Sequence, residues 1–134
     1  MKLKDLLNHI TGYSDIVGIE IRYKLIPIDS TLFPQCLRKP HDDEIWTRYG
    51  NDTVWSFAVV DRALIVNIGR DSMEDPAKTP YVVRYRYKDI HKRYEHTERM
   101  PVEFRCETER QMDHVIAYVT GHPDTHELLD PVRR

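Results

Sequence analysis

Apolar residues recur at helical spacing near both ends of the chain. Close to the N-terminus, one stripe has the i, i+3, i+4, i+7 spacing of a short amphipathic helix: Leu3, Leu6, Leu7 and Ile10. A second stripe with this spacing predicts another helix: Met112, Val115, Ile116 and Val119. This helix is expected to begin at a capping box of Thr108 and Gln111 and to end at Gly121. A shorter third helix is expected to start after Asp42 or Asp43 and to run through Tyr49.

Alternation of apolar and polar residues predicts strands between these helices. The segments are 16–25, 54–60, 63–68, 81–88 and 102–106, with an edge strand around 25–28 and a hairpin partner at 92–97 as further candidates. A helical turn is the alternative for the last of these. Only Asp61-Arg62 separates 54–60 from 63–68, which predicts a tight antiparallel hairpin. Because this hairpin is the most apolar part of the chain, we expect it at the centre of the sheet. We also expect both tryptophans in the core, Trp55 from the hairpin and Trp46 from the short third helix.

The order of these elements predicts an α+β fold. Short links between strands favour antiparallel pairing, since parallel pairs need a longer crossover. We therefore expect a mostly antiparallel β-sheet of about five or six strands, with the N-terminal and C-terminal helices packed on one face. A single domain is expected over residues 1–121, with a candidate seam in the polar connector 70–80, and a polar C-terminal tail over 122–134.

Composition limits the classes of protein that this chain can belong to. The 134 residues include 20 Lys and Arg against 22 Asp and Glu, a net charge of −2, which argues against a polybasic protein that coats nucleic acid. The charges are uneven, however: residues 81–99 hold six basic and three acidic groups, and residues 100–134 hold four and seven. Lys4 and Asp5 interrupt the first apolar run, which therefore lacks the continuous apolar stretch of a secretory signal. No other apolar stretch is long enough for a membrane span. We expect a cytoplasmic location and no membrane partner.

The basic segment 81–96 is the first candidate for a binding surface. Strand alternation places Arg84, Arg86 and Lys88 on one face, with tyrosines interleaved, a pattern typical of proteins that bind single-stranded nucleic acid. The full set of candidate binding residues is Arg84, Arg86, Lys88, Lys92, Arg93 and Tyr94. The more ordinary alternative is that the tyrosines face the core and that the cations are neutralised by glutamates on neighbouring strands: Glu95, Glu98, Glu103 or Glu107.

Residues suited to catalysis or metal binding do not form a recognisable motif. A histidine pair, His122 and His126, has the spacing of a helical metal-ligand pair, but Gly121 and Pro123 argue against a helix there. Cys36 precedes His41 in a proline-rich stretch, and Cys106 falls on the apolar side of its strand. The sequence contains no nucleophile elbow, phosphate-binding glycine loop or dinucleotide fingerprint. We expect no metal, no cofactor, no catalytic residue and no enzymatic activity.

Two stretches, KLKDLLNHI and RYGNDTVWSFAVVDRALIVNIG, follow a hydrophobic pattern that resembles small α+β proteins of bacteriophages and mobile elements of Firmicutes. The resemblance covers the first half of the chain and supplies no site residues. Some phage proteins of this size inhibit host defence systems, so it implies a regulatory protein that binds a protein partner, such as a defence component. The alternative is a nucleic-acid-associated protein that uses residues 81–94. Exposed strand edges also make a homo-oligomer a candidate assembly.

Overall fold

The chain forms an α+β fold that is built from two compact units, Met1–Arg70 and Asp71–Arg134. The computed structural model describes residues 1–10, 16–32, 44–88 and 101–133. Each unit has its own sheet, so the expected single sheet is replaced by one of four strands and one of three. The boundary between the units falls at the start of the polar connector 70–80, where the sequence places a candidate seam.

The first unit contains two helices and four strands. In chain order they are α1 (Leu3–Ile10), β1 (Gly18–Tyr23), β2 (Ile26–Leu32), α3 (Glu44–Tyr49), β3 (Thr53–Val60) and β4 (Ala63–Gly69). The strand order is β2-β1-β4-β3. The predicted hairpin of β3 and β4 is confirmed, but β3 lies at the edge of the sheet and not at its centre. The physical reason is that β1 pairs in parallel with β4, a pairing that uses the whole of β2, α3 and β3 as its crossover.

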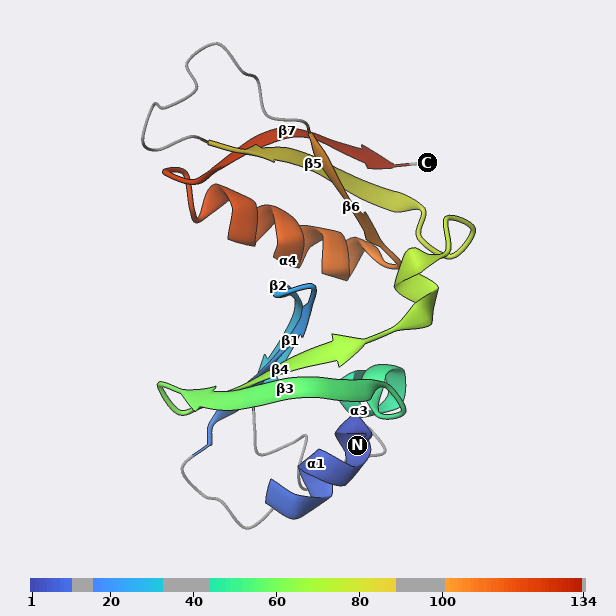
Figure 1. The fold of residues 1–134 in the computed structure, drawn as a ribbon, viewed down its shortest axis with the longest axis vertical. Coiled ribbons are helices and arrows are strands. Elements are labelled where there is room, and N and C mark those ends of the chain that lie inside the picture. Colours follow the sequence, from blue (N-terminus) through green and yellow to red (C-terminus); the bar gives the residue numbers. More distant parts are fainter. Residues whose placement is uncertain (11–15, 33–43, 89–100, 134) are drawn as a thin grey trace. The chain divides into compact units, whose positions relative to one another are not determined.

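Helices α1 and α3 lie on the same side of this sheet (Figure 1). The predicted first helix is confirmed, and its whole apolar stripe is buried. Against it lie the alternate residues of the two central strands, which form the core of this unit: Ile19, Ile21, Tyr23, Leu64, Val66 and Ile68. The residues between them on β1 and β4 face the other side of the sheet.

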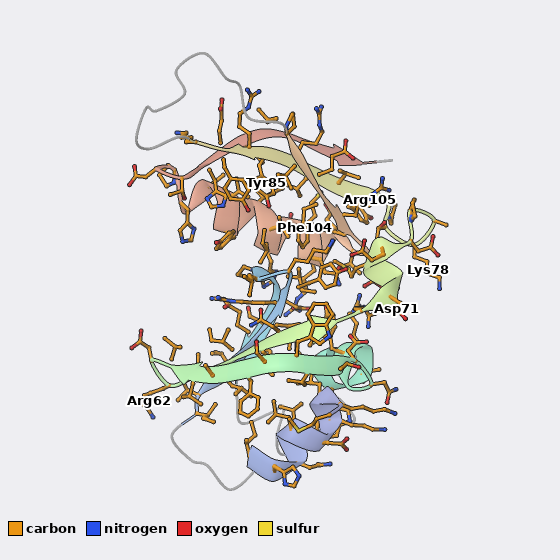
Figure 2. All side chains as sticks on the ribbon, in the orientation of Figure 1. Arg62, Asp71, Lys78, Tyr85, Phe104 and Arg105 are labelled. Atoms are coloured by element: carbon orange, nitrogen blue, oxygen red, sulfur yellow. The ribbon has the colours of Figure 1, made fainter. Side chains whose placement is uncertain are left out.

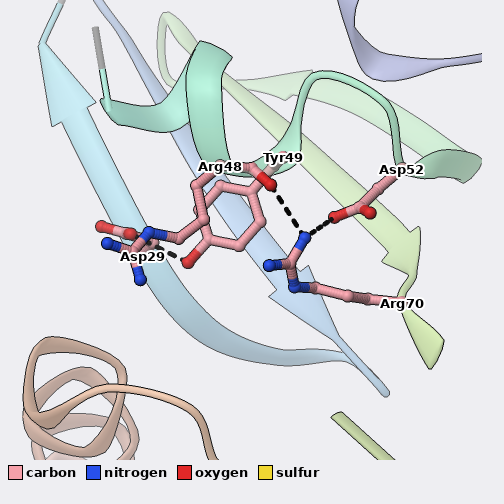
Figure 3. A network of polar contacts seen from close by, with 5 residues as sticks. All are labelled: Asp29, Arg48, Tyr49, Asp52 and Arg70. Carbon is pink, nitrogen blue, oxygen red and sulfur yellow. Dashed lines mark hydrogen bonds and ion pairs between the residues drawn. The ribbon is translucent and has the colours of Figure 1, made fainter. Parts of the chain in front are cut away.

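Two sets of polar contacts fix α3 in the first unit (Figure 3). The Tyr49 hydroxyl donates a hydrogen bond of 2.9 Å to Oδ2 of Asp29, a carboxylate on β2 that is only 2% exposed. The Arg70 guanidinium donates bonds of 2.8 Å to the carbonyl oxygen of Arg48 and to Oδ2 of Asp52. It also lies 5.1 Å from the centre of the Tyr49 ring. These contacts connect α3 to β2 on one side and to the end of β4 on the other.

Both hairpins of the first unit turn on two residues with positive φ. They are Lys24 and Leu25 between β1 and β2, and Asp61 and Arg62 between β3 and β4. Two consecutive positive φ angles are the requirement of a type I′ turn, whose twist matches that of the flanking strands. The tight turn expected at Asp61-Arg62 is therefore present without the glycine that such turns favour. Strand β1 correspondingly ends at Tyr23, two residues earlier than the sequence pattern suggested.

The second unit is a three-stranded antiparallel sheet with one long helix. Its elements are the short 3₁₀ helix η1 (Asp71–Glu74), β5 (Tyr81–Tyr87), β6 (Val102–Cys106), α4 (Glu109–Thr120) and β7 (His126–Arg133). The strand order is β6-β5-β7. Strand β7 occupies most of the segment that was expected to be a polar tail. As an edge strand it tolerates Pro131 and charged residues, which hid its strand character from the sequence pattern. The hairpin strand expected at 92–97 lies outside the described residues.

Helix α4 begins at a cap that the sequence predicts. The backbone N–H of Gln111 donates to Oγ1 of Thr108 at 3.1 Å, and the buried Gln111 side chain accepts from the N–H of Glu107 at 2.8 Å. The helix covers one face of the sheet, where Tyr85 and Phe104 are buried (Figure 2).

No helix in the described parts of the chain has the length and apolar character that a membrane span requires.

Replacing Leu25 by glycine, in the turn between β1 and β2, should stabilise the protein. Leu25 is 67% exposed at φ 67°, so Leu25→Gly removes the strain of a branched side chain at positive φ and loses little packing. We expect the free energy of unfolding in urea to rise by about 0.5–1 kcal/mol. The matched change Leu32→Gly, at a strand residue that is 74% exposed, should lower it by a similar amount. A loss of stability in Leu25→Gly would contradict the proposed turn.

Candidate functional site

Among the described residues of the first unit, the largest group of exposed apolar side chains lies on β3. Four of its large apolar side chains are at least half exposed: Trp55 (66%), Phe57 (50%), Val59 (56%) and Val60 (51%). The strand TVWSFAVV contains no charged residue, no proline and no glycine. Edge strands usually carry such residues, because a flat apolar edge pairs readily with other chains. The open edge of β3 is thus unprotected by its sequence.

Only the beginning of this edge is covered by other described residues. Lys2 forms an isolated antiparallel bridge with Thr53, and the Val54 N–H donates to the carbonyl oxygen of Met1 at 2.8 Å. Beyond this point, no described strand pairs with the outer side of β3. Residues 55–60, which we call the β3 edge, therefore present backbone N–H and C=O groups that another strand can bind.

A β-bulge determines which way the side chains of the β3 edge point. The register against β4 shifts between Val54 and Ser56, which places Trp55 at the bulge. Trp55 lies over Gly69, where an added Cβ atom would come within 2.8 Å of the indole ring. We expected Trp55 in the core on the same face as Phe57 and Val59. That expectation is wrong, because the extra residue in the bulge turns Trp55 to the opposite face.

On the face that carries α1, the β3 edge borders an apolar groove of about 560 Å³. Its lining comes from three parts of the first unit, and His9 is the single titratable side chain among them: Met1, Leu6, His9, Ile10, Ile16, Phe57, Val59 and Leu64. A strand that paired with the β3 edge would direct every second side chain toward this groove. The groove and the backbone edge together form what we call the β3 site.

The β3 site was not among the predicted binding residues, although a signal for it exists. Eight uncharged residues, six of them β-branched or aromatic, precede a two-residue turn. When such a strand lies at the edge of a sheet, charged residues normally protect it from pairing with other chains. Sequence alone does not reveal whether a strand is central or at the edge. The apolar pattern of residues 54–60 is also typical of a buried strand, and for this reason the sequence predicts it at the centre of the sheet.

The predicted basic surface lies on the face of the second sheet opposite α4. Arg84 Nε is 3.8 Å from Glu103 Oε1 on β6, and Arg86 Nε is 3.6 Å from Glu127 Oε2 on β7. Glutamates on neighbouring strands therefore face two of the candidate cations, as in the alternative based on cross-strand pairs. Lys88 is exposed just beyond β5. The other three candidates, Lys92, Arg93 and Tyr94, lie outside the described residues.

Both ion pairs on this face are loose. The Nε atoms of Arg84 and Arg86 are buried and have no hydrogen-bond partner among the described residues, since their glutamates lie beyond hydrogen-bond distance. Exposed pairs of this kind contribute little to stability. The face is thus a mixed surface of alternating sign, and Glu103 and Glu127 would oppose the approach of a phosphate backbone.

Aromatic side chains gather where β5 and α4 end and β7 begins. This Tyr/His cluster has ring centres 4.4–6.0 Å apart, and its members are Tyr85, Tyr87, Tyr118, His122 and His126. Burial raises the pKa of the Tyr85 hydroxyl, and the adjacent Tyr87 raises it further. Burial also lowers the pKa of His126, and the neighbouring His122 adds to that effect. Neutral forms of both side chains are therefore favoured in this cluster.

The two histidines of the cluster are brought together by a turn that we did not expect. The N–H of His126 donates to the carbonyl oxygen of His122 at 2.9 Å, which closes one helical turn after α4. Pro123 fits there because the first residue of a turn needs no N–H donor. The two ring centres lie 6.0 Å apart. Within the described ranges, no three His, Cys, Asp or Glu side chains come together, whereas a zinc site needs three or four ligands.

Cys106 is a buried core residue of the second sheet, as the strand pattern predicts. Burial raises the pKa of its thiol to about 12, and the nearby Glu107 adds to the shift. Because the thiolate is the reactive form, this side chain is unsuited to nucleophilic chemistry. Cys36 and His41, the other candidate pair, lie outside the described residues.

Acid should weaken the second unit through His126. Its lowered pKa means that the unfolded chain binds a proton more readily than the native one, so stability falls as the pH drops through about 6.5. We expect the urea midpoint to decrease between pH 7.5 and 5.5, and we expect His126→Gln to show a smaller decrease. His114→Gln, a substitution on α4 outside the cluster, should keep the wild-type difference. An unchanged pH dependence in His126→Gln would contradict this role.

The Cys106 thiol should resist alkylation in the native protein. In a Cys36→Ser background, iodoacetamide at pH 8 should leave Cys106 unmodified by mass spectrometry, because burial and the raised pKa both suppress the thiolate. Guanidinium chloride should make the same residue fully reactive within minutes. Rapid modification without denaturant would show that this core opens readily.

No protein-family model, no curated protein and no solved structure matches this chain. Its function is therefore inferred from the surfaces and side chains described above.

Proposed function

We propose that this protein is a non-enzymatic binding protein that recognises a polypeptide partner by strand addition at the β3 site. The observation that carries the proposal is the uncharged, apolar edge of β3, with which no described strand pairs beyond the bridge of Lys2 to Thr53. In strand addition, backbone hydrogen bonds give affinity, and pockets for alternate side chains give specificity. The β3 edge offers the first of these features, and the adjoining groove offers the second.

The chemistry of the groove indicates what such a partner strand contains. Of its lining side chains only His9 is titratable, and the rest are apolar. A partner strand should therefore direct apolar side chains into the groove and should lack charge along the paired segment. The resemblance to phage-borne proteins, some of which act on host defence systems, covers the same first unit and also supports a protein as the partner.

The second unit supports a nucleic-acid partner less well. The face of its sheet opposite α4 holds Arg84 and Arg86, but each faces a glutamate on the neighbouring strand. A nucleic acid would have to displace Glu103 and Glu127 to bind the two guanidinium groups. No described carboxylate lines the β3 site.

A display library of random decapeptides tests strand addition at the β3 site. We expect enriched peptides to alternate apolar residues without charge, and we expect Val59→Asp to weaken their binding at least tenfold because it places a carboxylate beside the groove. Leu32→Asp, the matched change on the opposite edge strand, should leave the affinity unchanged.

Backbone methylation separates strand addition from simple apolar contact. Two versions of a bound peptide are compared, one methylated on its odd-numbered backbone nitrogens and one on its even-numbered nitrogens. One version should lose binding and the other should keep it, because only one of the two sets of N–H groups faces β3. Equal affinity for both methylated peptides, or an absence of enriched peptides, would contradict the proposed function. Binding of single-stranded DNA that falls steeply with salt would favour the nucleic-acid alternative instead.

A further inference from the structure

We infer that the strand that occupies the β3 site is β3 of a second copy of this chain, paired antiparallel across a two-fold axis. This inference rests on the proposed function, because it names the partner of the same site. The pairing would join two four-stranded sheets into one continuous sheet of eight strands, with β3 of each copy at the centre.

The length of the regular part of β3 fixes the register of this pairing. The bulge at Trp55 and the turn at Asp61 leave five regular residues, Ser56–Val60, with Ala58 in the middle. In an antiparallel pair, facing residues point to the same side of the sheet. The two-fold axis therefore passes beside Ala58, whose small side chain meets its own copy without a clash.

This register matches side chains that suit each other. On the side of the groove, Phe57 of each copy faces Val59 of the other copy. A pair of an aromatic and a β-branched side chain on neighbouring strands is favourable. Ser56 faces Val60 on the other side of the sheet. No like charges meet along the five paired residues, since the strand carries none.

The turn at the end of the paired segment carries one acidic and one basic residue, Asp61 and Arg62, and its acidic residue can form a contact of opposite charge across the interface. Asp61 of one copy would lie next to the beginning of β3 in the other copy, where Lys2 bridges Thr53. Both Asp61 and Lys2 are exposed. The two-fold axis repeats this acidic–basic contact at the other end of the interface. Because Lys2 already covers the start of β3, the paired segment also ends where the partner chain turns away.

The available area suits a weak but specific dimer. The exposed parts of Trp55, Phe57, Val59 and Val60 amount to roughly 400 Å² per copy. Two copies with their backbone edges would bury roughly 1,000 Å², near the lower limit of specific interfaces. We expect a dissociation constant on the order of 1–100 µM.

Charge at the axis tests the dimer and its register together. Sedimentation equilibrium should show a dimer for the wild-type chain, and Ala58→Lys should raise the dissociation constant at least tenfold because two ammonium groups would meet at the axis. Leu32→Lys, on the opposite edge of the same sheet, should leave the dimer intact. An equimolar mixture of Ala58→Lys and Ala58→Glu should restore dimers, since opposite charges then face each other. Circular dichroism checks that each variant is folded.

The outcomes separate this inference from the proposed function. A wild-type chain that is monomeric at about 100 µM, yet binds peptides at the β3 site, would overturn the inference and leave the function standing. A dimer that persists in Ala58→Lys, or a mixture that stays monomeric, would also overturn it, because the interface or register would be different. A monomer that binds no peptide would refute both.

Discussion

Parallel pairing between β1 and β4 is the constraint on which the first unit depends. It uses the edge of β4 that the β3–β4 hairpin leaves open, so β4 is paired on both sides and becomes a central strand. As a consequence, β3 remains at the edge although its sequence has the composition of a buried strand. The apolar groove follows from the same arrangement, because α1 covers the sheet only in part beside β3. A pairing between distant segments thus creates the surface that we propose as the binding site.

Local features of the fold could be predicted from the sequence. Helix α1 and the cap of α4 depend on residues within a few positions of each other, and the sequence pattern placed both correctly. The hairpin of β3 and β4 was likewise predicted from two alternating segments and a two-residue turn. In each case the determining contacts are close in sequence, so the periodicity of apolar residues contains the necessary information.

Features that depend on distant contacts could not be predicted in this way. The position of Trp55 depends on a one-residue bulge, which changes the side of the sheet without changing the apolar pattern. Strand β7 contains Pro131 and charged residues, and it becomes a strand because β5 offers it an edge. For the same reason Glu127, which faces Arg86, was missed as a neutralising partner, while Glu103 on the predicted strand β6 was anticipated.

The position of Trp55 over Gly69 has a consequence for how the protein can be observed. The chain contains two tryptophans, and Trp46 on α3 is partly buried whereas Trp55 is 66% exposed. Because Gly69 leaves room for the indole ring, Trp55 rests against β4. Its emission therefore comes from the first residue of the β3 edge. The protein carries an intrinsic fluorophore at its own proposed binding site, and occupancy can be followed there without a label.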